Sequence, residues 1–171
     1  DIGGGSTEIV RGRRGEAELE AAKSLDIGSV RLTERHVHHD PPTAGELAAI
    51  DADVAAALES APAIESARLV GVAGTVTTLA AIAAGIDPYD AERVHGLDLG
   101  LAELEEVAAR LASLPLAERT KLPGLSPKRA DVIVAGARIA VAVARAARAP
   151  SLLVSDRGVR WGIADALATG L

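Results

Sequence analysis

The first eight residues, Asp1-Ile2-Gly3-Gly4-Gly5-Ser6-Thr7-Glu8, carry the pattern that decides the fold. Three consecutive glycines leave their backbone N–H groups uncovered by side chains, so the turn that they form can close around a phosphate. The same residues also fit a tight hairpin turn, with Ser6 and Thr7 bonded to the local backbone. Because a turn of this kind follows a strand, we expect Asp1 and Ile2 to end a strand that lies mostly before Asp1.

Carboxylates flank the glycines on both sides, at Asp1 and Glu8. Carboxylate oxygens are hard donors that suit Mg²⁺ and can also position a water molecule. A phosphate cradle between two carboxylates indicates phosphoryl transfer.

The composition describes one domain with an aliphatic core. The chain has 171 residues, of which 49% are apolar, with no Phe, Met or Cys and with a single Trp and a single Tyr. The net charge of −6 argues against broad electrostatic binding of nucleic acid. No apolar run approaches the roughly 20 residues that span a bilayer. The absence of cysteine excludes disulfides and is compatible with the cytosol.

Local patterns predict an α/β fold with a mixed sheet. Residues 7–10 and 16–27 read as a hairpin around a turn at 12–15, and residues 88–100 as irregular. Thr43 and Glu46 have capping-box spacing and should begin a helix. The other expected elements are helices at 28–39, 76–84, 101–111, 126–148 (with Ser126 as its cap) and 158–167, and strands at 67–73 and 151–154.

A second segment suited to an anion is Val72-Ala73-Gly74-Thr75-Val76-Thr77-Thr78. It reads as a strand, a glycine and the start of a helix, where free N–H groups and the helix dipole favour a negative charge. Ordinary capping of the helix by Thr75 is the alternative.

Three other groups of polar residues have simpler interpretations. Ser155 or Asp156 should cap the last helix, and Arg160 should be a surface charge. The adjacent imidazoles of His38 and His39 would diverge on a helix. A solvated helix end is therefore favoured over a metal site for residues 36–39. Arg129, at the start of the long buried helix, should serve packing or ion pairing.

Taken together, these segments resemble the exopolyphosphatase / guanosine pentaphosphate phosphohydrolase (Ppx/GppA) family. The opening octet is similar to the hallmark of that family. Similar segments follow in family order at residues 24–32, at 72–75, at 122–125 with 129–131, and at 154–156 with Gly158 and Arg160. Trp161 departs from the family, in which an acidic residue often follows the arginine.

The resemblance implies the actin-like ATPase (ribonuclease H-like) fold, an α/β domain with a mixed sheet of five-stranded type flanked by helices. Residues 1–171 would be the second of two domains that face a cleft, and the first domain is absent. The first strand of the sheet would be largely missing, which leaves an apolar gap and should make the isolated chain poorly soluble.

The resemblance also implies a reaction, the Mg²⁺-assisted attack of water on a terminal phosphate of inorganic polyphosphate or pppGpp. Carried over by motif, Asp1 and Glu8 would be metal ligands, and Glu8 would be the nearest candidate for a catalytic residue. The residues implied to bind phosphate are Gly3, Gly4, Gly5, Ser6, Thr7, Gly74 and Thr75. The glutamate thought to activate the water in this family belongs to the first domain, so we expect the fragment alone to be inactive.

Two other functions stay open. One is a non-catalytic sensor that binds polyphosphate or a guanosine polyphosphate, and the other is a kinase or ATPase of the same fold. The expected partners are the phosphate ligand and the first domain of the same protein, with a homodimer as a further option and with neither nucleic acid nor membrane. The expected location is the cytoplasm.

Overall fold

The computed structural model describes residues 1–13, 16, 18–64 and 68–170. Four residues of the expected hairpin and third strand, Arg14, Gly15, Ala17 and Ala67, lie outside this part. The strands are β1 (Thr7–Gly12), β2 (Leu19–Leu25), β3 (Val70–Val72), β4 (Asp98–Gly100) and β5 (Ser151–Ser155). The helices are α1 (Ser29–His36), α2 (Ala44–Leu58), α3 (Ala73–Ala83), α4 (Ala91–Val94), α5 (Leu101–Ser113), α6 (Leu116–Arg119), the 3-10 helix η1 (Pro127–Arg129), α7 (Ile133–Ala146) and α8 (Val159–Thr169).

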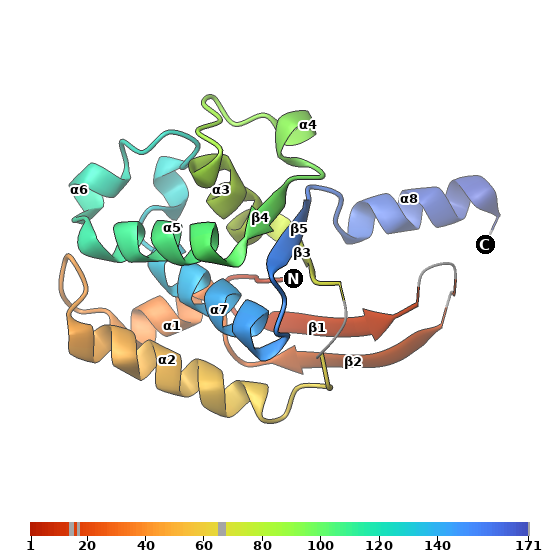
Figure 1. Cartoon of the computed structure of the whole chain (residues 1–171), viewed down its shortest axis with the longest axis horizontal. Coiled ribbons are helices and arrows are strands. Elements are labelled where there is room, and N and C mark those ends of the chain that lie inside the picture. Colours follow the sequence, from red (N-terminus) through yellow and green to blue (C-terminus); the bar gives the residue numbers. More distant parts are fainter. Residues whose placement is uncertain (14–15, 17, 65–67, 171) are drawn as a thin grey trace.

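The expected hairpin is formed by β1 and β2, which pair in antiparallel fashion (Figure 1). The glycine turn precedes it and folds back, so that Ile2 forms an isolated bridge with Thr7. Asp1 and Glu8 exchange both of their backbone hydrogen bonds, each 2.9 Å long. Asp1 and Ile2 therefore already lie alongside β1 as the end of a strand would.

The other three strands form a mixed sheet in the order β3-β5-β4. β3 runs parallel to β5, whereas β4 runs antiparallel to it. The prediction of irregular structure over residues 88–100 was wrong at α4 and β4. Strand β4 has only three residues, too few to show an alternating pattern, and it exists because it pairs with β5. Among the described residues the five strands form two separate sheets, and β1 and β3 are not hydrogen-bonded to each other.

Helix α7 occupies the centre of the fold, as its apolar sequence predicted, and packs against α1, α2, α3 and α5 (Figure 1). Its Ile133 and Ile139 are almost completely buried. The expected helix over 126–148 is divided into η1 and α7, and Ser126 makes no side-chain capping bond. Helix α2, in contrast, begins with the predicted capping box between Thr43 and Glu46.

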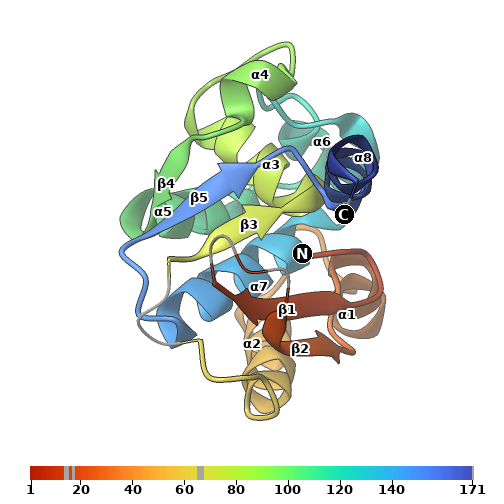
Figure 2. The same cartoon turned by 90° about the vertical axis from the view of Figure 1, so that its right-hand side faces the viewer.

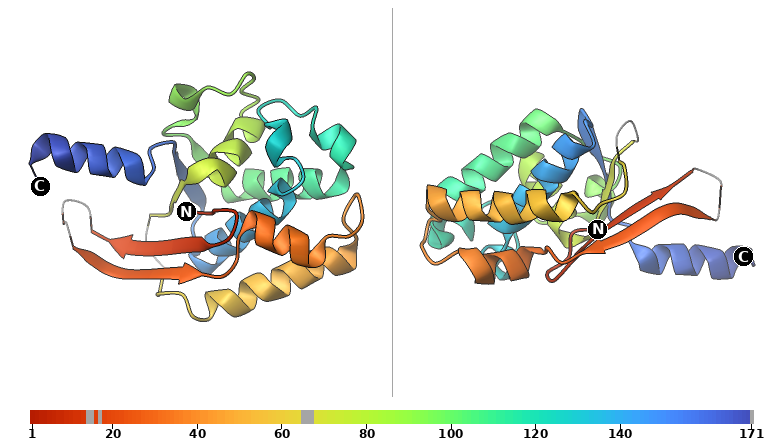
Figure 3. Two further views of the ribbon diagram at one scale, coloured as in Figure 1. Left: turned by 180° about the vertical axis from the view of Figure 1, so that it is seen from behind. Right: turned by 90° about the horizontal axis from the view of Figure 1, so that it is seen from below.

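The last helix, α8, projects away from the body of the molecule (Figures 1 and 3). Four of its large apolar side chains are exposed, namely those of Val159, Trp161, Ile163 and Leu167. No helix in the described part of the chain is long and apolar enough to cross a membrane.

Candidate phosphate site

The glycine turn is held against the start of α1 through its carbonyl groups. The backbone N–H groups of Ser29 and Val30 donate to the carbonyls of Gly3 and Gly4, respectively, both at 2.9 Å. The Nε of Arg31, in α1, donates to the carbonyl of Gly5 at 2.6 Å. This close approach requires a glycine just before α1. A Cβ placed on Gly28 would lie 2.4 Å from the carbonyl oxygen of Gly4. The carbonyls of the turn are thus directed to α1.

The backbone N–H groups of Gly4, Gly5 and Ser6 have no hydrogen-bond partner within the described residues. Consecutive free N–H groups of this kind form a concave anion-binding surface. The geometry therefore favours the phosphate interpretation of the turn over the plain hairpin turn.

The strand-to-helix junction from β3 to α3 lies directly beside this turn. The hydroxyl of Thr75, which is 2% exposed, donates to the carbonyl of Ile2 at 2.9 Å. Ala73 has a φ of 68°, in the left-handed region that residues with a Cβ rarely adopt, at a cost of about 1–2 kcal/mol. Backbone strain of this kind is found preferentially at functional sites.

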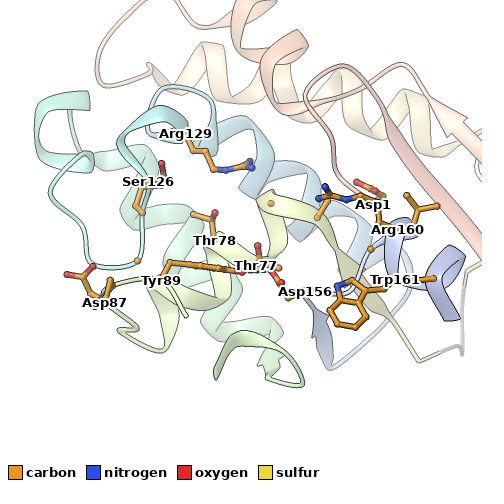
Figure 4. A pocket seen from close by; sticks show the side chains of 18 residues that line it. Asp1, Thr77, Thr78, Asp87, Tyr89, Ser126, Arg129, Asp156, Arg160 and Trp161 are labelled. Atoms are coloured by element: carbon orange, nitrogen blue, oxygen red, sulfur yellow. Dashed lines mark hydrogen bonds between the residues drawn. The ribbon is translucent and has the colours of Figure 1, made fainter. Parts of the chain in front are cut away.

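Two cavities open at this junction. The large cavity, of about 990 Å³, is lined by residues of α3, by the loops before α4 and η1, and by the start of α8, with Asp1 at its edge (Figure 4). The loop cavity, of about 470 Å³, is lined by the glycine turn, the start of α1 and the segment around η1. Four residues line both cavities: Ala73, Gly74, Ser126 and Arg129.

Arg129 is the basic side chain at the junction of the two cavities. Its guanidinium group forms no hydrogen bond or ion pair with the described residues. It lies directly over Gly74, where an added Cβ would be 2.1 Å from one of its terminal nitrogens. Lys128 lines the loop cavity and Arg160 lines the large cavity. Neither side chain forms an ion pair within the described part of the chain. Three cations therefore remain free to bind an anion.

The opposite wall of the large cavity carries an aromatic and acidic pair. The hydroxyl of Tyr89 donates to a carboxylate oxygen of Asp156 at 2.5 Å, and Figure 4 shows this pair across from Arg129. Burial, followed by the bond to Asp156, raises the pKa of the Tyr89 hydroxyl. Trp161 lines the same cavity, with the guanidinium of Arg157 at 4.9 Å from its ring centre. The only tyrosine and the only tryptophan of the chain thus line one cavity.

The two predicted carboxylates are placed differently. Asp1 lines the large cavity. Glu8 lies outside the residues that line it and accepts hydrogen bonds from the hydroxyls of Ser6 at 2.6 Å and Ser24 at 2.8 Å. Those two hydroxyls, Ser6 first, lower the pKa of Glu8, so its carboxylate is ionised at neutral pH. Its catalytic role stays a prediction.

The predicted cap of the last helix is wrong, and two threonines implied to bind phosphate have hydroxyls that are bonded within the fold. The hydroxyl of Thr7 is buried and donates to the carbonyl of Ile27 at 2.7 Å, and the hydroxyl of Thr75 is bound to Ile2. Both hydroxyls therefore stabilise the turn, and phosphate binding by Thr7 and Thr75 stays a prediction. Neither Ser155 nor Asp156 caps α8, because the N-cap of that helix is Gly158. The carboxylate of Asp156 accepts from Tyr89 instead.

Arg129 and Tyr89 are the cavity residues that the sequence interpretation missed. Arg129 was assigned to packing or pairing, and Tyr89 fell in a segment expected to be irregular. Tyr89 is the only tyrosine of a chain with one tryptophan and no phenylalanine, and this rarity could have marked it as a candidate site residue. Arg129 lies in one of the segments that resemble the family, but its place in the site depends on the contact with Gly74, which no local pattern shows.

Comparison with known proteins identifies relatives of this chain. The sequence matches the Ppx/GppA phosphatase family over residues 1–169. It is 44% identical over 176 aligned residues to Exopolyphosphatase 2 of Mycobacterium tuberculosis, covering 98% of this chain and 54% of the relative. It is 30% identical over 174 residues to Exopolyphosphatase 1 of Mycobacterium leprae, covering 95% of this chain and 49% of that protein.

A solved structure agrees with the sequence matches. The Ppx/GppA family member of Aquifex aeolicus superposes with a TM-score of 0.90 at 32% identity, covering 99% of this chain and 55% of the other. The chain spans about half the length of the curated relatives that it matches. The predicted α/β, actin-like ATPase fold is confirmed. The chain belongs to the Ppx/GppA phosphatase family.

Proposed function

We propose that this chain is the second domain of a phosphohydrolase that releases terminal phosphate from inorganic polyphosphate. The observation that carries the proposal is the convergence of two unpaired groups on neighbouring cavities. These are the N–H groups of the glycine turn and the guanidinium of Arg129. In the proposed whole protein a first domain forms the other wall of the site.

The chemistry of phosphoryl transfer matches what these residues offer. The protein has to position the phosphoryl group and neutralise the charge on its oxygens, with little covalent chemistry of its own. The free N–H groups of the turn would bind a phosphate oxygen, while Arg129 and Lys128 would balance the charge of the chain of phosphates. The attacking water would be oriented by carboxylates, of which Glu8 remains the candidate in this chain.

Mg²⁺ fits the donors at the site. Asp1 and Glu8 offer hard carboxylate oxygens, and the described residues contain no cluster of three or more histidine or acidic side chains that could enclose an ion. Two carboxylates are enough for Mg²⁺, which proteins usually bind through one or two carboxylates, with phosphate oxygens and water as the other ligands. When bound, the ion would neutralise charge on the phosphate oxygens.

A guanosine polyphosphate such as pppGpp is the second candidate substrate, and the two aromatic residues of the large cavity favour it. The rings of Tyr89 and Trp161 are partly exposed there, at 43% and 55%. Aromatic rings of this kind can stack on a nucleobase. A linear polyphosphate has no ring to stack on them.

The proposal is tested in the full-length protein by phosphate release from polyphosphate and from pppGpp. We expect Asp1→Ala and Glu8→Ala each to lower the rate, while Asp98→Ala, an exposed carboxylate in β4, leaves it unchanged. Unchanged rates in both site variants would remove these residues from the mechanism. Tight ligand binding without phosphate release would favour the sensor, and ATP-dependent product formation would favour a kinase.

Two further parts of the proposal concern the whole protein. A cytoplasmic location is compatible with the absence of cysteine. A homodimer stays a prediction, which the molar mass of the full-length protein in solution would test.

A further inference from the structure

The unpartnered N–H groups of the glycine turn belong to three consecutive peptide groups. Each peptide group joins the carbonyl of one residue to the N–H of the next, so the carbonyl of Gly5 and the N–H of Ser6 form a single rigid unit. The peptide bonds of the turn are trans. In a planar trans peptide the C=O and the N–H point in opposite directions. Whatever binds the three carbonyls of the turn therefore also sets the direction of its three N–H groups.

The donors that bind these carbonyls all come from α1, which lies beside the turn in Figure 2. The carbonyl of Gly3 accepts from the backbone N–H of Ser29 at 2.9 Å. The carbonyl of Gly4 accepts from two backbone N–H groups, those of Val30 at 2.9 Å and Arg31 at 3.0 Å. The N–H groups of the same peptides are consequently directed away from these donors, where a ligand can reach them.

The third carbonyl, that of Gly5, is bound in a different way. Its donor is the Nε of the Arg31 side chain, at 2.6 Å. Among the described residues no backbone N–H donates to it. The peptide between Gly5 and Ser6 is thus the one unit of the turn whose direction depends on a side chain, and a substitution can remove that side chain without changing the backbone donors.

Arg31 is well placed to hold this peptide. Its backbone N–H and its Nε bind two successive carbonyls, those of Gly4 and Gly5. Its closest carboxylate is that of Asp26, at 3.7 Å from a terminal nitrogen. The Asp26 side chain is 95% exposed, and an ion pair in such a position contributes little. The short bond to Gly5 is therefore the main contact of the Arg31 guanidinium.

We propose that Arg31 is a positioning residue of the phosphate site. Its Nε holds the carbonyl of Gly5 against α1 and thereby directs the N–H of Ser6 toward the phosphate. The inference rests on the proposed phosphohydrolase function and deepens it, because it names the group that orients one of the phosphate donors. A donor that is already oriented before the substrate arrives needs no reorganisation during the reaction.

The loss of this bond has a defined consequence. Gly5 has no Cβ to restrict its backbone, so the peptide between Gly5 and Ser6 can rotate once its carbonyl is released. The N–H of Ser6 is then correctly directed only part of the time. We expect a loss of about 10-fold in kcat/KM, smaller than the loss of about 10²–10³-fold that follows when such a donor is removed outright.

Two variants of the full-length protein separate positioning from charge. In Arg31→Gln, the amide nitrogen stands at the same place along the side chain as Nε, so a neutral N–H donor is kept. In Arg31→Met, both the donor and the charge are lost. We expect Arg31→Met to lower kcat/KM for polyphosphate by about 10-fold, and Arg31→Gln to retain most of the wild-type value. An equal loss in both variants would mean that the charge of Arg31 acts on the substrate directly, and would overturn the positioning role. Wild-type activity in Arg31→Met would overturn it as well.

Arg35→Met is the matched control for an effect on folding. Arg35 is another exposed arginine of α1, and its contact is an ion pair with Asp53 at 2.7 Å. Its substitution removes a charged bond from the same helix without touching the glycine turn. We expect unfolding midpoints similar to that of Arg31→Met, together with wild-type kcat/KM. A similar loss of activity in Arg35→Met would show that the effect comes from α1 as a whole, and would overturn the specific role of Arg31.

Binding of inorganic tripolyphosphate, measured by calorimetry, gives a readout that does not depend on hydrolysis. We expect Arg31→Met to bind it more weakly than Arg31→Gln and wild type do. Equal binding by all three would overturn the inference. If the wild type binds tripolyphosphate with this ranking of variants but releases no phosphate, the proposed hydrolase is wrong and the role of Arg31 in binding stands. No binding by the wild type would overturn both.

Discussion

Arg119 and Arg129 lie in the same segment between α5 and α7, yet their surroundings differ. Arg119 is 3% exposed and binds the carboxylate of Asp40 at 3.1 Å. Burial lowers the pKa of Arg119, and the nearby Asp40 opposes that shift. Arg129 is exposed beside two cavities, lies over Gly74 and has no ion-pair partner within the described residues.

The same contrast extends to the regions around the two arginines. Near Arg119, the two oxygens of Asp40 also accept from the backbone N–H of Leu116 at 2.8 and 2.9 Å. Near Arg129, the N–H groups of Gly4, Gly5 and Ser6 have no partner in the described part of the chain, and Ala73 has a strained backbone. Paired polar groups stabilise the fold, whereas groups left without partners at a strained junction are available to a ligand.

The largest expected effect is the loss of activity in Arg129→Ala of the full-length protein. Removing a charged donor from a phosphoryl-transfer site should lower kcat/KM for polyphosphate by about 10²–10³-fold. The unfolding midpoint should hardly move, because Arg129 has no hydrogen-bond or ion-pair partner to lose among the residues that the structure describes. Arg110→Ala, an exposed arginine on α5, serves as the control. Wild-type activity in Arg129→Ala would show that Arg129 does not bind the substrate, and would contradict the difference in role between the two arginines.

Gly28→Ala should disturb the glycine turn from the side of α1. The new Cβ would meet the backbone of Gly4 at 2.4 Å, an overlap that neither segment can relieve by a rotamer change. Overpacking of this kind costs about 1–3 kcal/mol, and it should also weaken activity. Gly45→Ala is the matched control, because no atom lies within 4 Å of its added Cβ. Urea unfolding of both variants checks this, and equal stabilities would show that the turn can move away from α1.

Asp40→Ala should have the opposite profile from Arg129→Ala. It leaves the N–H of Leu116 without its acceptor and the buried guanidinium of Arg119 with only a long bond to the carbonyl of Leu111. Because the Asp40 side chain is 47% exposed, we expect a loss of about 2 kcal/mol, less than for a fully buried pair. The kcat/KM of the folded variant should be that of the wild type. A large loss of activity at full folding would mean that Asp40 also affects the site.

The smallest expected effect is a dependence of stability on acid pH through Glu46. The ring of His39, followed by the backbone N–H of Thr43, lowers the pKa of Glu46 from 4.5 to about 2. The folded-state pKa is depressed, so the stabilisation is present above pH 4.5 and is lost as the pH falls toward 2. Unfolding midpoints of wild type and Glu46→Gln should differ at pH 7 and converge near pH 2–3. A difference between the two midpoints that stays constant with pH would show that the lowered pKa of Glu46 does not contribute to stability.

The sequence was sufficient for the parts of the fold that local patterns control. The glycine octet with its hairpin and the capping box at Thr43 and Glu46 appear as predicted. The apolar sequence of α7 correctly placed this helix at the centre. Each of these features is set by neighbours within a few residues along the chain.

Features made by distant contacts could not be predicted in this way. Strand β4 depends on pairing with β5, and the site role of Arg129 depends on its approach to Gly74. The hydroxyls of Thr7 and Thr75 each donate to the carbonyl of a distant residue, a contact that no local pattern indicates. The sequence thus indicated which segments form the site, whereas only the structure shows which of their polar groups are free.

The central claim is that residues 1–171 form one wall of a two-sided phosphohydrolase site. The most direct measurement is phosphate release from polyphosphate with Mg²⁺ by the full-length protein and by residues 1–171, compared at equal concentration. We predict release by the full-length protein and none by residues 1–171. Release at a comparable rate by residues 1–171, or none by a folded full-length protein, would contradict the account.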